Sequence, residues 1–347
     1  MKGLSQMTDE FYMQLALDEA WKYQLLTYPN PAVGAVVVQE GKILSVEAHQ
    51  KAGTSHAEVL ALLGAYEVLS GKRVDFDRFD SHKAHAFLLD LPREFFSECS
   101  IYVTLEPCSH EGQTPSCASL LAELQLQEII IGTKDPIVGH DGGIDIVGRD
   151  ATMTNTFAPT IKIGILEEAC KALLEPFLIW QKRAFVLFKL AQTSNGRIGG
   201  GYLSSQASLT HVHQLREVCD TLLIGGNTVR VDRPTLDCRF TGGEAPDVVI
   251  YTREDGLDRE IPLFGVSDRE VRVSDSLEFL EKPSFVLVEG GAGMLEALQE
   301  RLDWMLIYQT PKLSANQLSY NTPMNLEFLH QSKKDVDLIL WSRRSGH

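Results

Sequence analysis

The chain has 347 residues, more than one typical hydrophobic core supports, so we expect two domains. Hydrophobic residues make up 44% and charged residues 23% of the chain, which excludes a disordered or fibrous protein. The 47 acidic and 32 basic residues give a net charge of −15. Nucleic acids and membrane surfaces are anionic, so this charge argues against either of them as a partner.

Membrane and secretory signals are not expected in this sequence. No apolar run approaches the ~20 residues of a membrane helix, and Asp9 and Glu10 stand where a signal peptide would be apolar. The six cysteines are scattered along the chain, which favours reduced thiols or metal ligands over a disulfide framework. We therefore expect a cytoplasmic protein.

The first half alternates helical and strand patterns, which predicts a layered α/β domain. Thr8 is a candidate N-cap for a helix that ends near Tyr23, with Phe11 and Leu15 on one face. Further along, we expect strands at 33–38, 42–48, 101–104 and 129–131 and helices at 57–69 and 116–124.

The stretch 71–97 does not fit this alternation. Charged and histidine residues crowd it, so we predict an inserted excursion in which His82 and His85 are surface residues.

A helix is predicted at about 166–180, between the two halves. From Arg183 a second α/β series begins, with strands at 185–190, 221–225, 247–251, 285–288 and 304–308 and a helix near 209–218. These patterns predict a first domain at 1–150, a connecting segment at 151–182 and a second domain at 183–347.

Three residues in the first half have the chemistry of a metal site: His56, Cys108 and Cys117. One imidazole and two thiolates suit zinc, and three protein ligands leave a fourth position for water, as catalysis requires. Glu58 is a harder donor than thiolate and is then available to shuttle protons. The alternative is a closed, structural zinc site in which His110 or Cys99 is the fourth ligand.

The local sequence also favours a thiolate at Cys117. Thr114 can cap a helix with Pro115 at its first position, which places Cys117 in the first turn, where the helix dipole favours negative charge. His-x-Glu followed by Pro-Cys and a second Cys is the signature of zinc deaminases. The spacing differs, because eight residues rather than two separate the cysteines.

The motifs His49-x₆-His56-Ala-Glu58 and Thr104-Leu-Glu-Pro-Cys108-Ser-His110, followed by Thr-Pro-Ser-Cys117, carry a specific resemblance. They resemble the deaminase half of the bifunctional riboflavin-biosynthesis deaminase/reductase family, whose motif has the long cysteine spacing. The resemblance implies a cytidine-deaminase-like, three-layer α/β/α domain. It implies zinc ligands at His56, Cys108 and Cys117, a proton shuttle at Glu58, and substrate contacts at Asn30, His49 and His110. The insertion at 71–97 is not part of the family pattern.

Two glycine clusters follow strands in the second half, at 225–228 and 289–293. Such clusters either bring backbone N–H groups close to phosphates or form tight turns. The residues alone do not distinguish these two interpretations. An ordinary Gly-x-Gly-x-x-Gly fingerprint is absent from the sequence.

Segments around Lys189, His213 to Arg216, Pro234 to Arg239 and Glu289 to Gly291 resemble the reductase half of the same family. The resemblance implies a dihydrofolate-reductase-like α/β domain. It implies NADPH contacts at Thr228, Asp232, Gly290 and Gly291, and contacts to a phosphoribosyl substrate at Arg216, Leu236, Arg239 and Glu289. The sequence departs from the family at 193–195 and at Arg233, which replaces an acid. Arg230 and Arg233 are the nearest candidate cations for the cofactor phosphates.

The resemblance implies two successive reactions on one small-molecule phosphoribosyl pyrimidine. These are zinc-dependent deamination of 2,5-diamino-6-(5-phosphoribosylamino)pyrimidin-4-one and NADPH-dependent reduction of the product to a ribitylamino compound. It also implies a homo-oligomer formed through the reductase domain. The alternatives are a deaminase whose degenerate second domain serves only in oligomerisation, and a deaminase acting on nucleic-acid bases, which would need basic and aromatic contacts.

Overall fold

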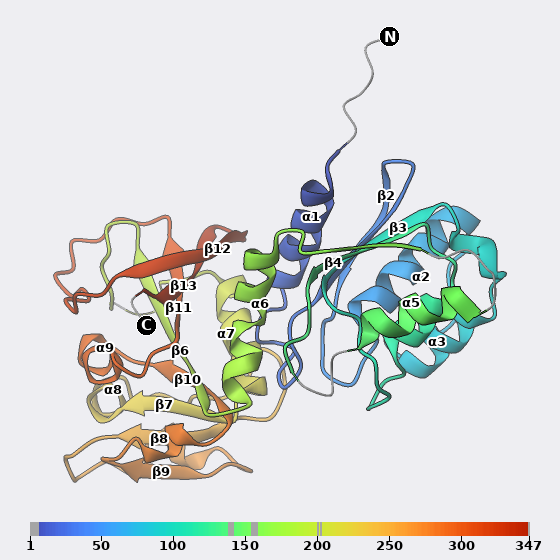
Figure 1. Ribbon diagram of the computed structural model, residues 1–347. Coiled ribbons are helices and arrows are strands. Elements are labelled where there is room, and N and C mark those ends of the chain that lie inside the picture. The colour runs from blue at the N-terminus through green and yellow to red at the C-terminus, as the bar shows by residue number, and fades with distance from the viewer. Residues whose placement is uncertain (1–6, 138–141, 154–158, 200, 202, 346–347) are drawn as a thin grey trace. The chain divides into compact units, whose positions relative to one another are not determined.

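The computed structural model describes residues 7–137, 142–153, 159–199, 201 and 203–345. The chain divides into two compact units, Met1–Glu175 and Pro176–His347, and the division falls within helix α6 (Glu167–Trp180) (Figure 1). The domain limits at 150 and 183 stay a prediction. Among the described residues, we find no helix with the length and apolar character needed to cross a membrane.

The first unit is built on a five-stranded sheet with the order β2-β1-β3-β4-β5. Strand β1 runs antiparallel to both of its neighbours, whereas β3, β4 and β5 are parallel. The strands are β1 (Gly34–Gln39), β2 (Lys42–Ala48), β3 (Cys99–Leu105), β4 (Glu128–Thr133) and β5 (Thr160–Ile163). The helices besides α6 are α1 (Asp9–Trp21), α2 (Ala57–Ser70), α3 (Ser81–Leu89), α4 (Cys117–Glu123) and α5 (Gly143–Met153).

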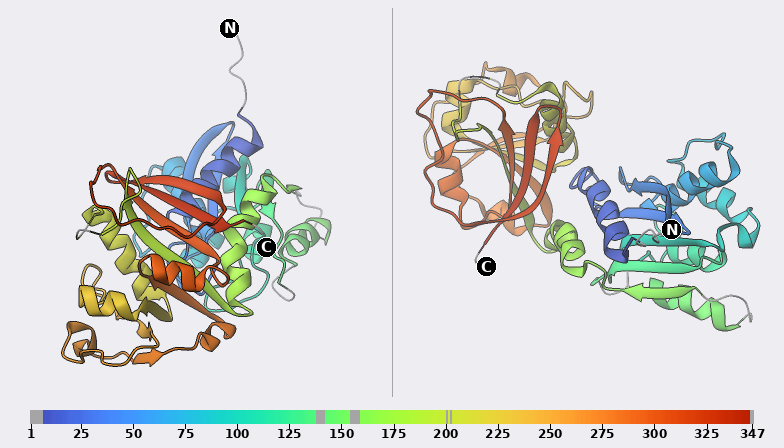
Figure 2. Two further views of the ribbon diagram at one scale, coloured as in Figure 1. Left: turned by 90° about the vertical axis from the view of Figure 1, so that its left-hand side faces the viewer. Right: turned by 90° about the horizontal axis from the view of Figure 1, so that it is seen from above.

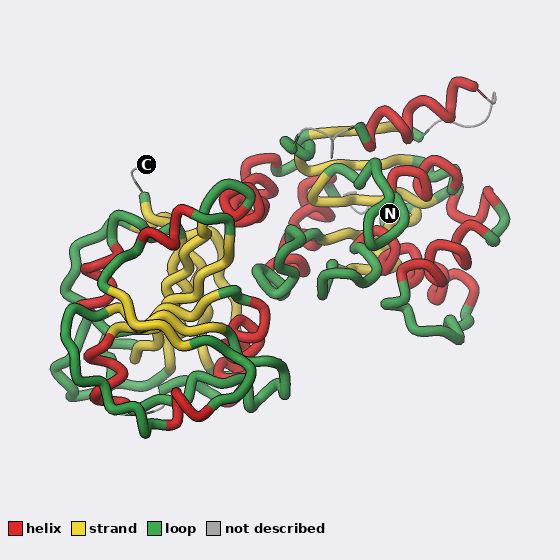
Figure 3. The backbone as a smooth tube through the Cα atoms, turned by 90° about the horizontal axis from the view of Figure 1, so that it is seen from below, coloured by secondary structure: helices red, strands yellow, loops and turns green. Residues whose placement is uncertain are grey.

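Helices cover both faces of this sheet, as the backbone trace shows (Figure 3). Alternate residues of β1 point to opposite faces, and Ala35 and Val37 are buried in the core that the sheet forms with α2 to α5. Gly34 faces α1, where an added Cβ would lie 1.9 Å from the carbonyl oxygen of Ala16. The predicted three-layer α/β/α arrangement is therefore confirmed.

Helix α1 begins as predicted, and the face that it buries is a different one from that of Phe11 and Leu15. The Thr8 hydroxyl accepts a hydrogen bond from the Phe11 amide at 3.4 Å, as expected of an N-cap. Phe11 itself is 41% exposed. The side chains that the helix buries belong to Tyr12, Met13, Ala16, Leu17 and Ala20.

The insertion at 71–97 is folded against the same core. It contains α3 and the 3₁₀ turn η1 (Arg93–Phe96), neither of which the sequence pattern predicted. Ala84, Leu88 and Phe96 are fully buried. His82 is exposed, as predicted, but the surface assignment of His85 is wrong, because its side chain faces the core and is 5% exposed.

The second unit contains an eight-stranded sheet with the order β12-β13-β11-β6-β10-β7-β8-β9 (Figure 2). The strands from β11 to β9 are parallel, and β13 runs antiparallel to both β11 and β12. The strands are β6 (Ala184–Thr193), β7 (Thr221–Gly225), β8 (Asp247–Tyr251), β9 (Val271–Ser274), β10 (Ser284–Glu289), β11 (Trp304–Thr310), β12 (Leu326–Lys334) and β13 (Asp337–Arg344). The helices are α7 (Gln206–Val218), α8 (Gly226–Asp232) and α9 (Ala292–Leu298), with 3₁₀ turns η2 (Pro262–Gly265) and η3 (Glu278–Glu281).

The register of this sheet places charged residues side by side near the carboxyl ends of its parallel strands. Lys189 of β6 and Glu289 of β10 are paired directly, and Glu289 is also paired with Ile224 of β7. Parallel strands end at the same edge, and ligands of open α/β sheets bind outside the carboxyl ends of the strands. The two glycine clusters lie at this edge, one at the junction of β7 and α8 and the other between β10 and α9.

We expect Gly34→Ala to destabilise the first unit by about 2–3 kcal/mol, because the new methyl group would overlap the α1 backbone. The matched control is Gly148→Ala in α5, where a Cβ meets nothing within 4 Å and should stabilise the helix by up to about 1 kcal/mol. Urea unfolding of both variants measures the difference. Equal stability of the two variants would contradict the close packing of α1 on β1.

Candidate active sites

The three predicted metal ligands lie together in the first unit. The Nδ1 atom of His56 is 3.7 Å from Cys108 Sγ and 3.4 Å from Cys117 Sγ. The three donor atoms lie within 4.8 Å of one another, and no fourth His, Cys, Asp or Glu among the described residues joins this group. The geometry therefore does not support the alternative of a closed site with His110 or Cys99 as a ligand.

Helix starts position two of the three ligands. His56 is the N-cap residue of α2, and Cys117 is the first residue of α4. The residue that caps α4 is Ser116, whose hydroxyl accepts from the Ser119 amide at 3.2 Å. The prediction that Thr114 caps this helix is therefore wrong, because Ser116 is the residue that takes the extended cap conformation.

Thr114 has a different partner. Its hydroxyl lies 3.1 Å from Nε2 of His56, and this contact orients the ring so that Nδ1 faces the two cysteines. A hydrogen bond to the far nitrogen of a ligand histidine is the usual way in which proteins fix its tautomer. The sequence analysis missed this role of Thr114.

The donor set fits zinc. Bond lengths of ~2.3 Å to sulfur and ~2.05 Å to nitrogen at a tetrahedral angle put the two donors roughly 3.6 Å apart, close to the separations found here. The Cys117 amide donates to Cys108 Sγ at 3.3 Å, which stabilises a thiolate. Hydrogen bonding from the Cys117 thiol and from His56 lowers the pKa of Cys108. A thiolate that is already favoured is what a metal ion requires.

Glu58 lies one residue past the start of α2 and is 4% exposed. Burial raises the pKa of its carboxyl group above the ordinary value, although the His56 ring opposes the shift. A carboxyl group with a raised pKa is suited to accept and return a proton near neutral pH.

Of the three substrate residues implied by the resemblance, Asn30 and His49 are in contact with each other, whereas His110 is exposed. The Asn30 side-chain amide lies 3.2 Å from Nε2 of His49, and Nδ1 of His49 lies 3.2 Å from the Ser55 carbonyl. Burial lowers the pKa of His49 to about 3, so the ring is neutral at physiological pH. The ring stands edge-on to His56 at 5.2 Å. His110 lies in the exposed loop between Cys108 and α4.

Glu106 of the Glu-Pro-Cys motif supports the loop that follows it. Its two carboxylate oxygens accept hydrogen bonds from the amides of Asp135, Gly142 and Ile144 at 3.1–3.2 Å. Gly143 begins α5 so close to Pro107 that an added Cβ would lie 1.9 Å from the Pro107 carbonyl oxygen. The Cys108 backbone is therefore held from the side of α5.

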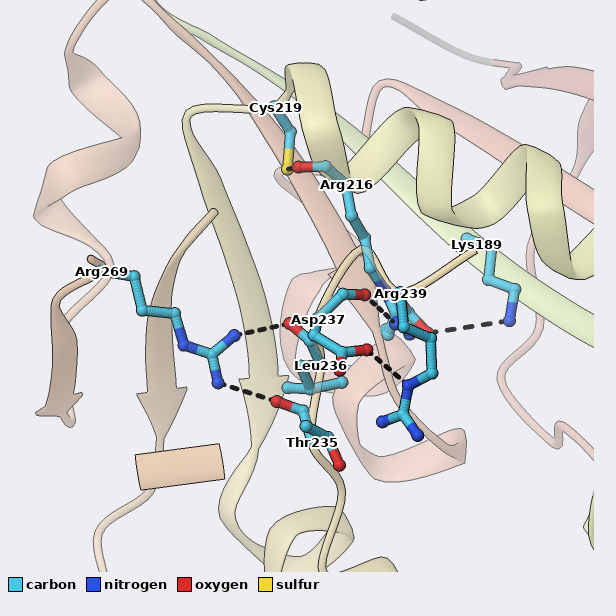
Figure 4. A network of polar contacts seen from close by, with 9 residues as sticks. Lys189, Arg216, Cys219, Thr235, Leu236, Asp237, Arg239 and Arg269 are labelled. Atoms are coloured by element: carbon cyan, nitrogen blue, oxygen red, sulfur yellow. Dashed lines mark hydrogen bonds and ion pairs between the residues drawn. The ribbon is translucent and has the colours of Figure 1, made fainter. Parts of the chain in front are cut away.

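In the second unit, a network of buried charged residues lies near the carboxyl ends of β6 and β10 (Figure 4). Arg216 of α7 forms two hydrogen bonds with Glu289, at 2.7 and 3.0 Å, and Lys189 lies 3.7 Å from the same carboxylate. Burial alone would raise the pKa of Glu289, but the two cations outweigh it and hold the pKa at about 2. Lys189 is a residue for which the sequence analysis proposed no role, and the β6–β10 register reveals it.

Two arginines hold the loop that precedes Arg239. Arg216 donates to the Asp237 carbonyl at 3.1 Å, and Arg269 donates to the Leu236 and Thr235 carbonyls at 2.5 and 2.7 Å (Figure 4). Leu236 has a left-handed backbone with φ of 56°, which is strained for a residue with a branched side chain. Arg239 pairs with Asp237 at 2.8 Å. The sequence analysis also missed Arg269.

The expected cofactor residues lie at the same edge. Gly290 and Gly291 follow β10, and Thr228 and Asp232 belong to α8, which follows β7. A Cβ on Gly290 would meet Met294 at 2.7 Å, whereas a Cβ on Gly291 would meet nothing within 4 Å. Gly291 therefore borders open space that a ligand can use.

The two candidate cations for the cofactor already have acidic partners. Arg230 lies 3.1 Å from the Glu254 carboxylate, and Arg233 lies 2.6 Å from that of Asp258. An anionic ligand would have to compete with these carboxylates for either guanidinium group.

At neutral pH, we expect Glu289→Gln to lower the free energy of unfolding of the second unit by about 3–5 kcal/mol, because Arg216 loses its buried partner. The folded-state pKa of about 2 is below the ordinary value of 4.5. The carboxylate therefore stabilises the fold above about pH 4.5, and this contribution is lost as the pH falls toward 2. Urea unfolding at several pH values should show the difference from the unaltered chain narrowing below about pH 4.5.

The control is Glu327→Gln, which breaks an exposed pair with Arg343. We expect it to change stability by less than about 1 kcal/mol. A Glu289→Gln effect that stays constant with pH, or that matches the control, would contradict the role of the buried charges.

Two family models match the chain. The cytidine and deoxycytidylate deaminase zinc-binding region matches residues 6–133, and the RibD C-terminal domain matches residues 184–314. These matches confirm the predicted fold of each half.

Curated relatives are similar in sequence to this chain over most of its length. The riboflavin biosynthesis protein RibD of Aquifex aeolicus is 31% identical over 303 residues, which cover 84% of this chain and 72% of that protein. The RibD protein of Corynebacterium ammoniagenes is 27% identical, with 88% of this chain and 87% of that protein covered.

Solved structures agree with this result. A Thermotoga maritima protein described as a diaminohydroxyphosphoribosylaminopyrimidine deaminase/5-amino-6-(5-phosphoribosylamino)uracil reductase has a TM-score of 0.63 and 26% identity, with 97% of this chain and 98% of that one covered. Acinetobacter baumannii RibD also has a TM-score of 0.63, at 22% identity, with 97% of this chain and 99% of that one covered. The chain therefore belongs to the RibD family of bifunctional riboflavin-biosynthesis enzymes, with a zinc-binding deaminase domain followed by a RibD C-terminal reductase domain.

Proposed function

We propose that the first unit deaminates 2,5-diamino-6-(5-phosphoribosylamino)pyrimidin-4-one and that the second reduces the resulting 5-amino-6-(5-phosphoribosylamino)uracil with NADPH. The name of the Thermotoga relative contains both reactions. The observation that supports the first reaction most directly is the His56, Cys108 and Cys117 cluster with the buried Glu58 beside it. A single incubation with the diamino substrate and NADPH tests the whole proposal, because ammonia release and NADPH oxidation are read separately.

In the deaminase site, His56, Cys108 and Cys117 would hold a zinc ion. A zinc ion with one open position acts as a Lewis acid and makes hydroxide available at neutral pH. Glu58 takes the proton of the attacking water and passes it to the departing amine, so that water and the amino group become a ring carbonyl and ammonia. The His49 and Asn30 pair orients the pyrimidine.

In the reductase site, NADPH would supply, when bound, the hydride for the ribosyl carbon that carries the nitrogen. The sugar ring then opens to a ribityl chain, which requires a proton at the ring oxygen. Lys189 is the buried ammonium group assigned to this step, since burial lowers its pKa and favours proton release. Arg216, Leu236, Arg239 and Glu289 would hold the phosphoribosyl part of the substrate.

The proposed cofactor site lies in the same unit, at the glycine residues that follow β10. Gly290 and Gly291 carry no side chain of their own that would keep a diphosphate from their backbone N–H groups. Thr228 and Asp232 complete the predicted contacts. The connected Lys189, Glu289 and Arg216 network argues against a degenerate second domain that serves only in oligomerisation.

The cytoplasmic location and the assembly of copies through the second unit belong to the same proposal. Strand β12 is at one edge of its sheet, and Phe328 on it is 69% exposed. An edge strand leaves backbone N–H and C=O groups unpaired along its outer side, and a strand of a second copy can pair there.

We expect Glu58→Gln to keep zinc and to lose deamination by about 10²–10⁴-fold or more, because a carboxamide cannot cycle a proton. Cys108→Ser is the contrasting variant and should lose the metal itself, since a neutral hydroxyl replaces a thiolate. Zinc content by elemental analysis and ammonia release are measured on both. The assigned roles fail if the Gln variant is purified without metal or remains active.

We expect Gly291→Val to abolish NADPH binding and reduction while deamination is unchanged. The valine meets no protein atom near its Cβ position, so the fold is kept and only the ligand space is filled. NADPH fluorescence titrations at two ionic strengths should give saturable binding to the unaltered chain that weakens with salt. No saturable binding at either ionic strength would remove the reductase activity from the proposal.

A further inference from the structure

We infer that the insertion, residues 71–97, is a brace that positions the ligand loop, residues 49–56, and that Ser55 and Arg78 are the positioning residues through which it acts. The ligand loop contains both His49 and the metal ligand His56. This inference rests on the proposed deaminase function.

Ser55 connects the insertion to the ligand loop: its amide and hydroxyl bind the insertion, and its carbonyl contacts His49 of the loop. It is fully buried. Its amide donates to the Phe79 carbonyl at 3.2 Å, and its hydroxyl donates to the Arg78 carbonyl at 2.7 Å. Its own carbonyl lies 3.2 Å from Nδ1 of His49. Two consecutive carbonyls of the insertion thus hold the residue that in turn holds His49 and directly precedes His56.

Arg78 ties the insertion to the elements on both sides of the ligand loop. Its guanidinium group donates to the Glu47 carboxylate of β2 at 2.8 Å and to the Leu60 carbonyl of α2 at 3.1 Å. Strand β2 leads into the ligand loop and helix α2 leaves it. The Arg78 carbonyl that receives the Ser55 hydroxyl is therefore fixed relative to both ends of the loop.

The rest of the insertion is anchored firmly enough to bear on the loop. The ring of Phe87 in α3 packs on Tyr66 of α2 at 4.8 Å and on Phe76 at 5.3 Å. Phe95 of η1 contacts the same Tyr66 ring at 5.6 Å. Residues of the insertion also belong to the core beneath the sheet. A displaced insertion would have to give up this aromatic packing, so the brace is stiff.

A shift of Ser55 would disturb two functions together. The His56 ring would move relative to the two cysteines, and His49 would lose the orientation that pairs it with Asn30. Outer-shell contacts of metal ligands typically contribute ~10–100-fold to metal affinity or activity. We expect a loss at the lower end of that range, because the Ser55 amide bond to Phe79 remains when only the hydroxyl is removed.

The test compares Ser55→Ala with the matched control Ser70→Ala in the full-length protein. The Ser70 hydroxyl also donates to a backbone carbonyl at 2.7 Å, that of Tyr66, but it lies at the far end of α2 from the ligand loop. Zinc affinity is measured by competition with a chromophoric chelator. The absorption spectrum of the cobalt-substituted protein reports the geometry of the site, and kcat and KM are measured for each reaction.

Ser55→Ala should bind zinc about tenfold more weakly than Ser70→Ala, with an altered cobalt spectrum and a raised KM for deamination. The reductase parameters should be the same in both variants. If the two variants agree in zinc affinity and in cobalt spectrum, the brace is refuted. If the unaltered chain itself neither binds zinc nor releases ammonia, the proposed function has failed instead.

Arg78→Met keeps the test decisive where Ser55→Ala does not fold, because it removes both guanidinium contacts and retains an aliphatic side chain. It should weaken zinc binding in the same direction, and Arg78→Lys, which keeps the charge, should recover part of the loss. Where Ser55→Ala does fold, the double variant should be no worse than the more damaged single variant, because the two residues act through one contact. Additive losses, or normal zinc binding in Arg78→Met, would overturn the inference.

Discussion

The first unit depends on three donor atoms meeting from segments that are 52 and 61 residues apart in the chain. Nothing local brings them together, so the sheet and the helices packed on it must do so. His56 and Cys117 begin two helices, and Cys108 follows the end of a central strand. Helix starts and strand ends are held in place by the packed core, yet their polar groups remain accessible.

The second unit is distinguished by cations that are buried next to a carboxylate. Under the proposed function, a chain with a net charge of −15 has to bind anionic molecules, and its second unit keeps two cations largely buried rather than on its surface. Lys189 and Arg216 lie against one buried carboxylate, so their charge is only partly neutralised and faces the strand edge. Charges in such a protected place are screened little by salt, unlike the exposed pairs of Arg233 and Arg239.

The motifs and the regular elements could be predicted from the sequence, because they depend on short-range patterns. The metal cluster, most strands and the helices α2, α4 and α7 are where periodicity and spacing placed them, within a few residues. Thr114, Ser55, Lys189 and Arg269 could not be assigned in this way, because their partners lie far along the chain and only the folded sheet brings them close. Helix α3 within the insertion was missed for another reason: it is short, and two of its four buried residues, Ser81 and His85, are polar.

Arg269 holds the loop before Arg239 and the turn η2 together through main-chain carbonyls, those of Thr235 and Leu236 in the loop and that of Leu263 in η2. Such a grip does not depend on which side chains these positions carry. Residues that face a ligand can therefore be exchanged during evolution, or by design, while the path of the loop is preserved. The arrangement separates the shape of the loop from the chemistry of its side chains, which is the condition under which one scaffold can acquire new substrate preferences by point substitution.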